Sequence, residues 1–303
     1  MPIVRWAFDV RQSLSLENVE PLVTLLIDGD NDKRIVPVLN LLNYLPESES
    51  DSLLQIRLED GMRRALVARL MLFAFFTAYH KCRWEDLTFD KSKSTKPVLL
   101  SPEHLVNVSF NISHHGDWVV LVGETETCAG SPVLLGVDVV NFQGPHLREP
   151  SETLSSYIQD QQFTPKEMSF MAEAPEESSP SSNESQLERT RRPWCLNGSI
   201  VKALDAPSDF VLKSIEFTIQ DEEETEKPIH STVIEVRESK PGLPEEGWSF
   251  EEALLDENHR YAIAAQSVAE KTIFDGSEIR RLDWKELLKD AVPYPDRTSP
   301  TSS

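Results

Sequence analysis

Residues 106–122 read VNVSFNISHHGDWVVLV, and this stretch carries the first indication of the fold class. Apolar side chains alternate over 106–112, which is typical of a strand with one buried face. Residues 118–122 are nearly all apolar, as in a buried strand. Between them, residues 113–117 (SHHGD) have the composition of a turn. The stretch therefore predicts two strands joined by a turn.

Helices and further strands flank this stretch on both sides. Upstream, residues 59–82 place apolar side chains at helical spacing, and downstream 133–139 is another apolar run. The second half predicts a helix from Trp194 to Leu204, followed by strands at 211–219, 232–237, 248–250 and 261–268. A helix followed by strands thus occurs twice, before and after about residue 140, without a visible sequence repeat. This order favours an α+β fold over a doubly wound α/β fold.

Three segments lack the pattern of a helix or strand. Residues 172–193 (AEAPEESSPSSNESQLERTRRP) are rich in Ser, Glu and Pro, which predicts a disordered insertion. The acidic run 221–226 is expected to be a solvated hairpin loop. A Pro/Ser/Thr tail from about Pro293 is expected to be disordered.

The net charge argues against two classes of partner. The chain has 303 residues with 30 Lys and Arg against 51 Asp and Glu, a formal charge of −21. Nucleic-acid binders need clustered basic residues, and an acidic chain is repelled by anionic membranes. One basic island interrupts the acidity, because residues 57–96 hold nine basic and five acidic residues. It is either an ordinary solvated helix face with a loop or a surface that attracts an anionic ligand.

The cysteines and the N-terminus indicate a reduced compartment. Cys82, Cys128 and Cys195 form no disulfide framework and no CxxC zinc pair. The start of the chain has no signal-peptide pattern, and no apolar run approaches the ~20 residues of a membrane span. We therefore expect a soluble cytoplasmic protein.

Three islands contain side chains that suit phosphate chemistry. Ser113 and His114 could hold a phosphate by hydrogen bonds. Asp138 interrupts an apolar strand, where a carboxylate must be paired or bound to a cation such as magnesium. Lys202, on a helix, could neutralise a phosphate as a point charge. Taken singly, each also has a purely structural interpretation: a local turn, a buried structural acid and an exposed helix lysine.

In their order along the chain, these islands resemble the 4′-phosphopantetheinyl transferase superfamily, and most closely its two-lobed surfactin-synthetase-activating and eukaryotic aminoadipate-pathway type. The likeness runs from about residue 57 to 268, and its motifs are weak singly but specific in combination. The matching stretches are TKPVL (95–99), FNISH (110–114), GVD (136–138), FTPKE (163–167), the helix from Trp194 to Lys202, WSFEE (248–252) and DENHRY (256–261).

The resemblance implies a reaction and a set of roles. Such enzymes move the phosphopantetheine arm of coenzyme A to a serine of an apo carrier protein and release 3′,5′-ADP. Carried over by position, Lys96, Ser113, His114 and Lys202 bind coenzyme A. Asp138 binds magnesium, and Asp138 and Lys202 are the catalytic pair. The expected partner is an apo carrier protein or carrier domain, and the protein is expected to be a monomer.

The resemblance also implies an architecture of two similar α+β lobes in a pseudo-twofold arrangement, with the cofactor cleft between them. The expected division is an N-terminal lobe over 1–140 and a C-terminal lobe over 141–271 that carries the insertion 172–193. An extension over 272–303 ends in the partly disordered tail.

The chain departs from the family in one helix. Asn197 and Gly198 stand where the family has Lys-Glu, and that glutamate is a metal ligand. Three explanations stay open: a compensating acid such as Glu167, a degenerate member that binds coenzyme A or carrier protein without turnover, or a mis-predicted exon edge. An acidic interaction protein without a ligand is a further alternative. It predicts that the basic island is scattered rather than gathered near His114 and Lys202.

Overall fold

The computed structural model describes residues 3–12, 41–56, 59–90, 96–126, 133–141, 163–172, 182–205, 214–219, 227–238, 242–267 and 273–294. Its strands are β1 (Ile3–Asp9), β2 (Thr88–Asp90), β3 (Val98–Ser101), β4 (Phe110–His115), β5 (Trp118–Glu124), β6 (Leu134–Asn141), β7 (Ile215–Thr218), β8 (Val233–Val236), β9 (Trp248–Asp256), β10 (His259–Gln266) and β11 (Arg280–Leu282). Its helices are α2 (Glu47–Leu54), α3 (Glu59–His80), α5 (Pro165–Ala172), α6 (Ser182–Leu204) and α8 (Trp284–Leu287), with short 3-10 turns at Leu42–Tyr44, Trp84–Asp86 and Glu103–Leu105.

The first sheet has the strand order β11-β1-β5-β4. β5 runs antiparallel to both β1 and β4, whereas β11 is parallel to β1. The helix α3 covers one face of this sheet, and its aromatic residues Phe73, Phe75 and Phe76 are fully buried there. This helix therefore supplies most of the core on that side.

The second sheet has the order β6-β10-β9, and both of its pairings are antiparallel. The helix α6 packs on one face through Cys195, Leu196 and Ile200, which are fully buried. β2–β3 and β7–β8 form separate two-stranded pairs.

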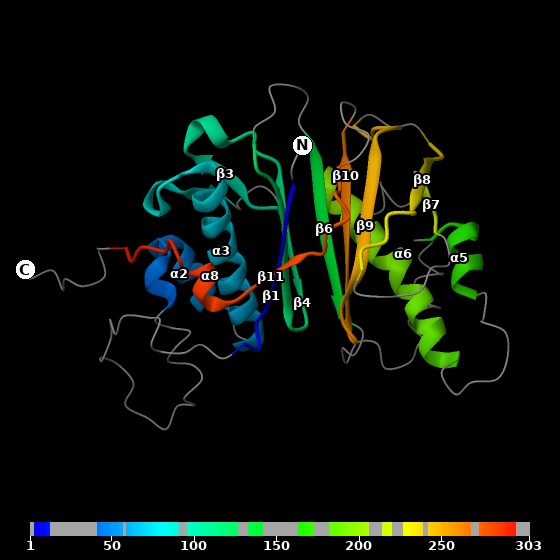
Figure 1. The fold of residues 1–303 in the computed structure, drawn as a ribbon, viewed down its shortest axis with the longest axis horizontal. Coiled ribbons are helices and arrows are strands. Elements are labelled where there is room, and N and C mark those ends of the chain that lie inside the picture. The colour runs from blue at the N-terminus through cyan, green and yellow to red at the C-terminus, as the bar shows by residue number, and fades with distance from the viewer. Residues whose placement is uncertain are drawn as a thin grey trace, which may run out of the picture.

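The two sheets pack against each other through the faces that their helices leave open. Val120 and Val122 of the first sheet share one buried cluster with Val137 and Ile263 of the second. Figure 1 shows the sheets side by side in the centre, with α3 on the outer side of one and α6 on the outer side of the other. The layers therefore run α3, first sheet, second sheet, α6.

The two halves repeat one order of elements. In the first, β1 and α3 precede the hairpin β4–β5, and in the second, β6 and α6 precede the hairpin β9–β10. In both sheets the later hairpin strand lies in the middle, giving β1-β5-β4 and β6-β10-β9. The mixed α+β class that the sequence predicts is therefore observed.

The first strand of the predicted hairpin begins and ends later in the sequence than expected. β4 covers Phe110–His115, not 106–112, because Val106 belongs to the turn after Glu103–Leu105 and is 41% exposed. His114 and His115 pair with Val119 and Trp118, so the turn shortens to two residues, Gly116 and Asp117. Gly116 has a φ of +55°, which a glycine adopts without strain.

Two predicted boundaries also differ from the structure. α6 begins at Ser182 rather than Trp194, so the last twelve residues of the expected disordered insertion, 182–193, are helical. β6, which the sequence placed in the N-terminal lobe, pairs with β10 and so belongs to the second sheet. The expected loop 221–226 and most of the expected tail, from residue 295, lie outside the described residues.

Within the described ranges, none of the helices combines the length and the apolar composition that a bilayer crossing requires. Cys82 and Cys195 carry free thiols, and Cys128 lies outside those ranges.

Candidate functional site

Ser113, Asp138 and Lys202, which are distant in sequence, meet at the junction of the two sheets. Ser113 lies on β4 and Asp138 on β6, and each of these is the edge strand of its sheet. Lys202 lies in the last turn of α6. The structure therefore brings together the serine, the acid and the lysine that the sequence predicted separately.

The three side chains form one hydrogen-bonded cluster. The Lys202 ammonium donates to Asp138 Oδ1 at 2.5 Å and to Ser113 Oγ at 2.6 Å. Ser113 Oγ donates to Asp138 Oδ1 at 3.1 Å. The Asp138 side chain is 13% exposed and that of Lys202 is 36% exposed. A carboxylate that interrupts a buried strand is thus paired, as its position requires.

Gly136 allows α6 to approach β6 closely enough for this cluster to form. A Cβ atom at position 136 would overlap the backbone of α6 at Ser199 and Ala203. Lys202 lies between these two contacts in sequence, and Asp138 lies two residues after Gly136 on the same face of β6. The distance from lysine to aspartate therefore depends on the absence of a side chain at 136.

We expect Gly136→Ala to lower the free energy of unfolding by at least about 2 kcal/mol, because a helix backbone cannot rotate out of the way as a side chain can. The matched control is Gly123→Ala, where the three atoms nearest to a Cβ belong to the ring of Phe75. This variant should lose about 1 kcal/mol. Urea unfolding of the two variants tests whether Gly136→Ala loses more free energy of unfolding than Gly123→Ala. Equal losses would show that the close approach of α6 to β6 is not rigid.

Alternate residues of β4 reach across to β6. The amide Oδ1 of Asn111 accepts from Val137 N at 3.1 Å, and His115 Nδ1 accepts from Asn141 N at 3.2 Å. Ser113 lies between them on the same strand face, since side chains two apart share a face. One side of β4 is therefore fixed to β6 by side-chain hydrogen bonds.

His114 lies on the other face of β4 from Ser113, toward α3. Arg64 of α3 donates to the carbonyl oxygen of Gly116 at 2.9 Å, in the turn that follows His114. Part of the imidazole is open to solvent. The pKa of His114 is nevertheless lowered to about 4, mainly by desolvation and to a smaller extent by the positive charges of Arg64 and Lys202. The residue is therefore neutral near pH 7 until an anion approaches it.

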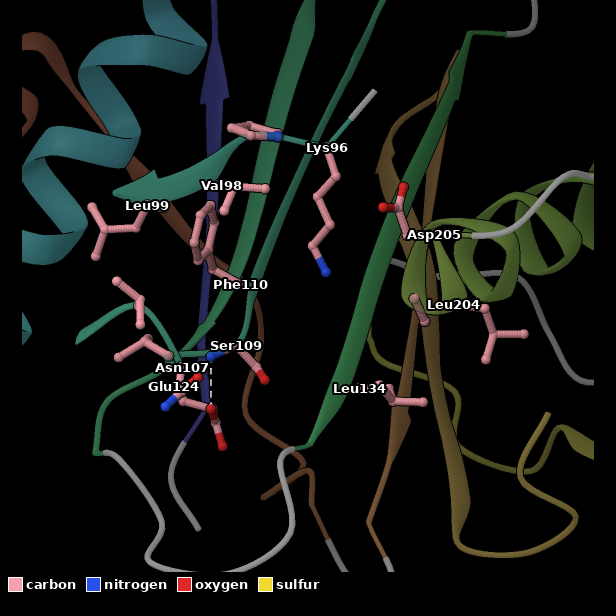
Figure 2. Close-up of a pocket in the computed structure, with 14 residues that line it drawn as sticks. Lys96, Val98, Leu99, Asn107, Ser109, Phe110, Glu124, Leu134, Leu204 and Asp205 are labelled. Carbon is pink, nitrogen blue, oxygen red and sulfur yellow. Dashed lines mark hydrogen bonds between the residues drawn. The ribbon is translucent and has the colours of Figure 1, made fainter. Parts of the chain in front are cut away.

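Lys96 lines a pocket of about 620 Å³, and the lining of this pocket does not include Ser113, Asp138 or Lys202. Its walls include Ser109 and Phe110, which precede Ser113 on the chain, and Leu204 and Asp205, which follow Lys202. Figure 2 shows the Lys96 side chain between the strands on one side and the end of α6 on the other. Burial lowers the pKa of Lys96, while the charge of Asp205 acts in the opposite direction.

Sequence reasoning did not single out Glu124 and Asp205, which also line this pocket. Glu124 is 2% exposed, and Oε2 accepts from Ser109 N at 2.8 Å. Among the residues that the structure describes, its Oε1 has no hydrogen-bond partner, and burial raises the pKa of this carboxyl group. The signal was present, because Glu124 ends an apolar strand just as Asp138 interrupts one.

The basic island is divided rather than gathered whole. Arg64 and Lys96 lie at the two places just described. Arg83 instead forms ion pairs with Glu85 and Asp86 on an exposed turn. Arg57, Lys91 and Lys93 lie outside the described residues. Arg64 thus lies near His114, whereas Lys96 lines a separate pocket and Arg69 pairs with Glu49, so the described part of the island is not gathered in one place.

Glu167 does not serve as a compensating acid at this site. It is 2% exposed, and its carboxylate accepts from Thr164 N at 2.9 Å and from Phe217 N at 3.0 Å. Both oxygens are therefore used to hold the start of α5 against β7, and this expectation of the sequence is wrong.

Gly198 faces Asp138 from α6. A Cβ at 198 would overlap Asp138 Oδ2, so the carboxylate occupies the space beside the helix that a side chain would fill. The described residues contain no cluster of three or more His, Cys, Asp or Glu arranged to hold a metal. Asp138 offers a single carboxylate, so magnesium held there would need waters and phosphate oxygens to complete its coordination.

Comparisons with known proteins were made on the whole sequence. The family model described as "4′-phosphopantetheinyl transferase, N-terminal" matches residues 37–126. An L-aminoadipate-semialdehyde dehydrogenase-phosphopantetheinyl transferase from Mus musculus is 27% identical over 233 residues, covering 75% of this chain and 67% of the relative. Its Homo sapiens counterpart is 28% identical over 204 residues, covering 67% and 60%. A phosphopantetheinyl transferase from Thraustochytrium is 23% identical over 243 residues, covering 80% and 76%.

Proposed function

We propose that this chain, which belongs to the 4′-phosphopantetheinyl transferase superfamily, transfers the phosphopantetheine arm of coenzyme A to a serine of an apo carrier protein. The observation that carries the proposal is the convergence of Ser113, Asp138 and Lys202. Each comes from a different motif of the resemblance, and together they place a cation and a hydroxyl side by side. Such an arrangement is suited to holding phosphates.

Coenzyme A offers groups that match both parts of the site. A pocket of about 620 Å³ is within the usual range for small-molecule sites, and it can take the nucleotide portion of the molecule. Lys96 supplies positive charge there, and Ser113, His114 and Lys202 are proposed to bind the phosphates. Ala203, which lines the pocket, follows Lys202 on α6, and we propose that one ligand occupies the pocket and reaches the cluster.

In the transfer, the carrier serine hydroxyl gives its proton to solvent, and its oxygen forms a bond to the phosphorus next to the pantetheine. The bond from that phosphorus to the bridging oxygen breaks, and 3′,5′-ADP leaves. Lys202 is placed to offset the negative charge on the phosphates, and Ser113 to orient them by its hydroxyl group. Asp138 is the residue that would hold magnesium, which supplies further charge neutralisation when it is bound.

The architecture supports a division into two lobes. We place β1 to β5 in the first and β6 to β10 in the second, related by a pseudo-twofold axis, with the cofactor between them. The segment 273–294 returns to the first lobe, because β11 pairs with β1. We further propose a monomer that acts in the cytoplasm.

Asn197 and Gly198 favour a second candidate, a degenerate member that binds coenzyme A or carrier protein without turnover. Asn197 is 5% exposed, and its Nδ2 atom has no hydrogen-bond partner within the described part of the chain. Glycine at 198 supplies no metal ligand. The residues that would contact phosphates are nevertheless all present, so this candidate keeps ligand binding and loses only the transfer.

A transfer assay separates the two candidates. The protein is incubated with coenzyme A, magnesium and an apo carrier protein, and the carrier is weighed by mass spectrometry. Added mass of one arm with the wild-type protein is the expected result. Transfer by Gly198→Glu but not by the wild type would favour the degenerate member. A wild type that neither transfers nor binds coenzyme A in calorimetry would contradict both.

A further inference from the structure

We propose that Lys202 closes the Asp138 carboxylate to divalent cations in the free protein, and that a bound pyrophosphate opens it. The proposal rests on the proposed function, since the pyrophosphate is that of coenzyme A. If Lys202 closes the carboxylate in this way, metal binding at Asp138 depends on bound coenzyme A.

The ammonium of Lys202 occupies the oxygen that a cation would use. It lies 2.5 Å from Asp138 Oδ1, and Ser113 Oγ donates to the same oxygen at 3.1 Å. One carboxylate neutralised by one ammonium has no net charge with which to attract a dication. A metal ion must therefore displace Lys202 or find it already moved.

The second carboxylate oxygen does not make a site by itself. Asp138 Oδ2 faces Gly198, which has no side chain to offer. Glu167 is the acid of the next motif along the chain, and both of its carboxylate oxygens accept hydrogen bonds from backbone amides. Among the described residues, Asp138 is thus without the acidic neighbours that make a metal site from protein alone.

Lys202 can leave Asp138 without disturbing the core. Its side chain is 36% exposed, and a lysine stem is flexible. A pyrophosphate next to the cluster offers the ammonium a stronger partner than a single carboxylate. Once Lys202 turns to the phosphate, Asp138 and the phosphate together attract a dication. By linkage, the metal then strengthens coenzyme A binding by the same factor.

Manganese is a suitable probe, because the electron paramagnetic resonance signal of free Mn²⁺ falls as the ion binds. Wild-type protein alone should leave the signal nearly unchanged. Protein with coenzyme A should lower the signal by more than the sum of the decreases that the protein and coenzyme A cause separately. Lys202→Met, without coenzyme A, should bind Mn²⁺ at least about tenfold more tightly than the wild type. Asp138→Asn should abolish the gain in both settings.

Lys166→Met is the matched control, because Lys166 lies on α5, donates to Thr218 and lies near Glu216, away from Asp138. It should behave as the wild type. Equal Mn²⁺ binding by the wild type and Lys202→Met would overturn the proposal. The Lys202→Met measurement needs no coenzyme A, so it tests the closure even if calorimetry finds no coenzyme A binding and the proposed function fails.

Discussion

Glu252→Ala is expected to lower the free energy of unfolding by about 3–5 kcal/mol, a large part of the total for a typical protein. Glu252 on β9 is fully buried and accepts from Arg192 of α6 at 2.8 and 3.0 Å, from Arg260 of β10 at 3.1 Å and from Thr232 at 2.6 Å. Burial acts to raise the pKa of Glu252, but the two arginines prevail and lower it. The variant therefore leaves two buried guanidinium groups without this carboxylate.

Urea unfolding followed by circular dichroism measures the loss. Glu252→Gln keeps a hydrogen-bond acceptor and should lose less, and Glu235→Ala, at an exposed position of β8, should stay within about 0.5 kcal/mol of the wild type. A loss below about 1 kcal/mol for Glu252→Ala would mean that the arginines find water or other acceptors. Because Arg192 and Lys202 share α6, the same network helps to hold the lysine at the site.

The strands of this fold were predictable where their own residues form an apolar run or alternation: the run 133–139 predicted β6, although β6 pairs with the distant β10. The hairpin β4–β5 gave an alternating pattern, although its turn was assigned three residues early. β1 was not predicted, because Arg5 breaks its apolar pattern. Arg5 is buried in an ion pair with Glu251, which is 246 residues away. No local pattern reports such a partner, so the strand is visible only once the two sheets are packed.

The boundary of α6 was hidden for a different reason. Residues 182–193 are rich in polar side chains, and composition alone favours a solvated segment. In the structure, Arg192 of this segment is 2% exposed and binds Glu252, while Arg189 stacks over Phe170 at 4.9 Å. Its helical state thus depends on tertiary contacts of charged residues, which a hydrophobic pattern does not register.

The site was predicted from the order of motifs, and the structure shows which of their side chains meet. That Ser113, Asp138 and Lys202 converge follows from the resemblance, but not from any spacing in the chain. That His114 faces away from Ser113 could not be seen while residues 113–117 were interpreted as a turn. In the strand β4, neighbouring residues must point to opposite faces, so the two side chains approach a ligand from different sides.

Lys202→Ala is expected to lower the transfer rate by about 10²–10³-fold, the usual cost of removing a group that stabilises charge in the transition state. It should also weaken coenzyme A binding by at least about tenfold, because a charge-assisted hydrogen bond is lost. The loss has a second cause, since Asp138 is then left without its cation beside the phosphates. Carrier mass spectrometry measures the transfer, and calorimetry measures the binding.

The double variant Asp138→Ala/Lys202→Ala separates these two causes. Measured without divalent cations, so that Asp138 holds no metal, it lacks the repelling carboxylate as well as the lysine and should bind coenzyme A more tightly than Lys202→Ala alone. With magnesium present it should remain unable to transfer the arm. Lys202→Arg keeps the positive charge, and we expect it to retain more binding than either variant. If the double variant binds no better than the single one, Asp138 does not face the phosphates, and the cluster at the sheet junction is structural. Coenzyme A binding that recovers without transfer would instead mean that Asp138 and Lys202 act on the reaction itself. Removing Lys202 would then weaken the binding of coenzyme A, and removing Asp138 would strengthen it.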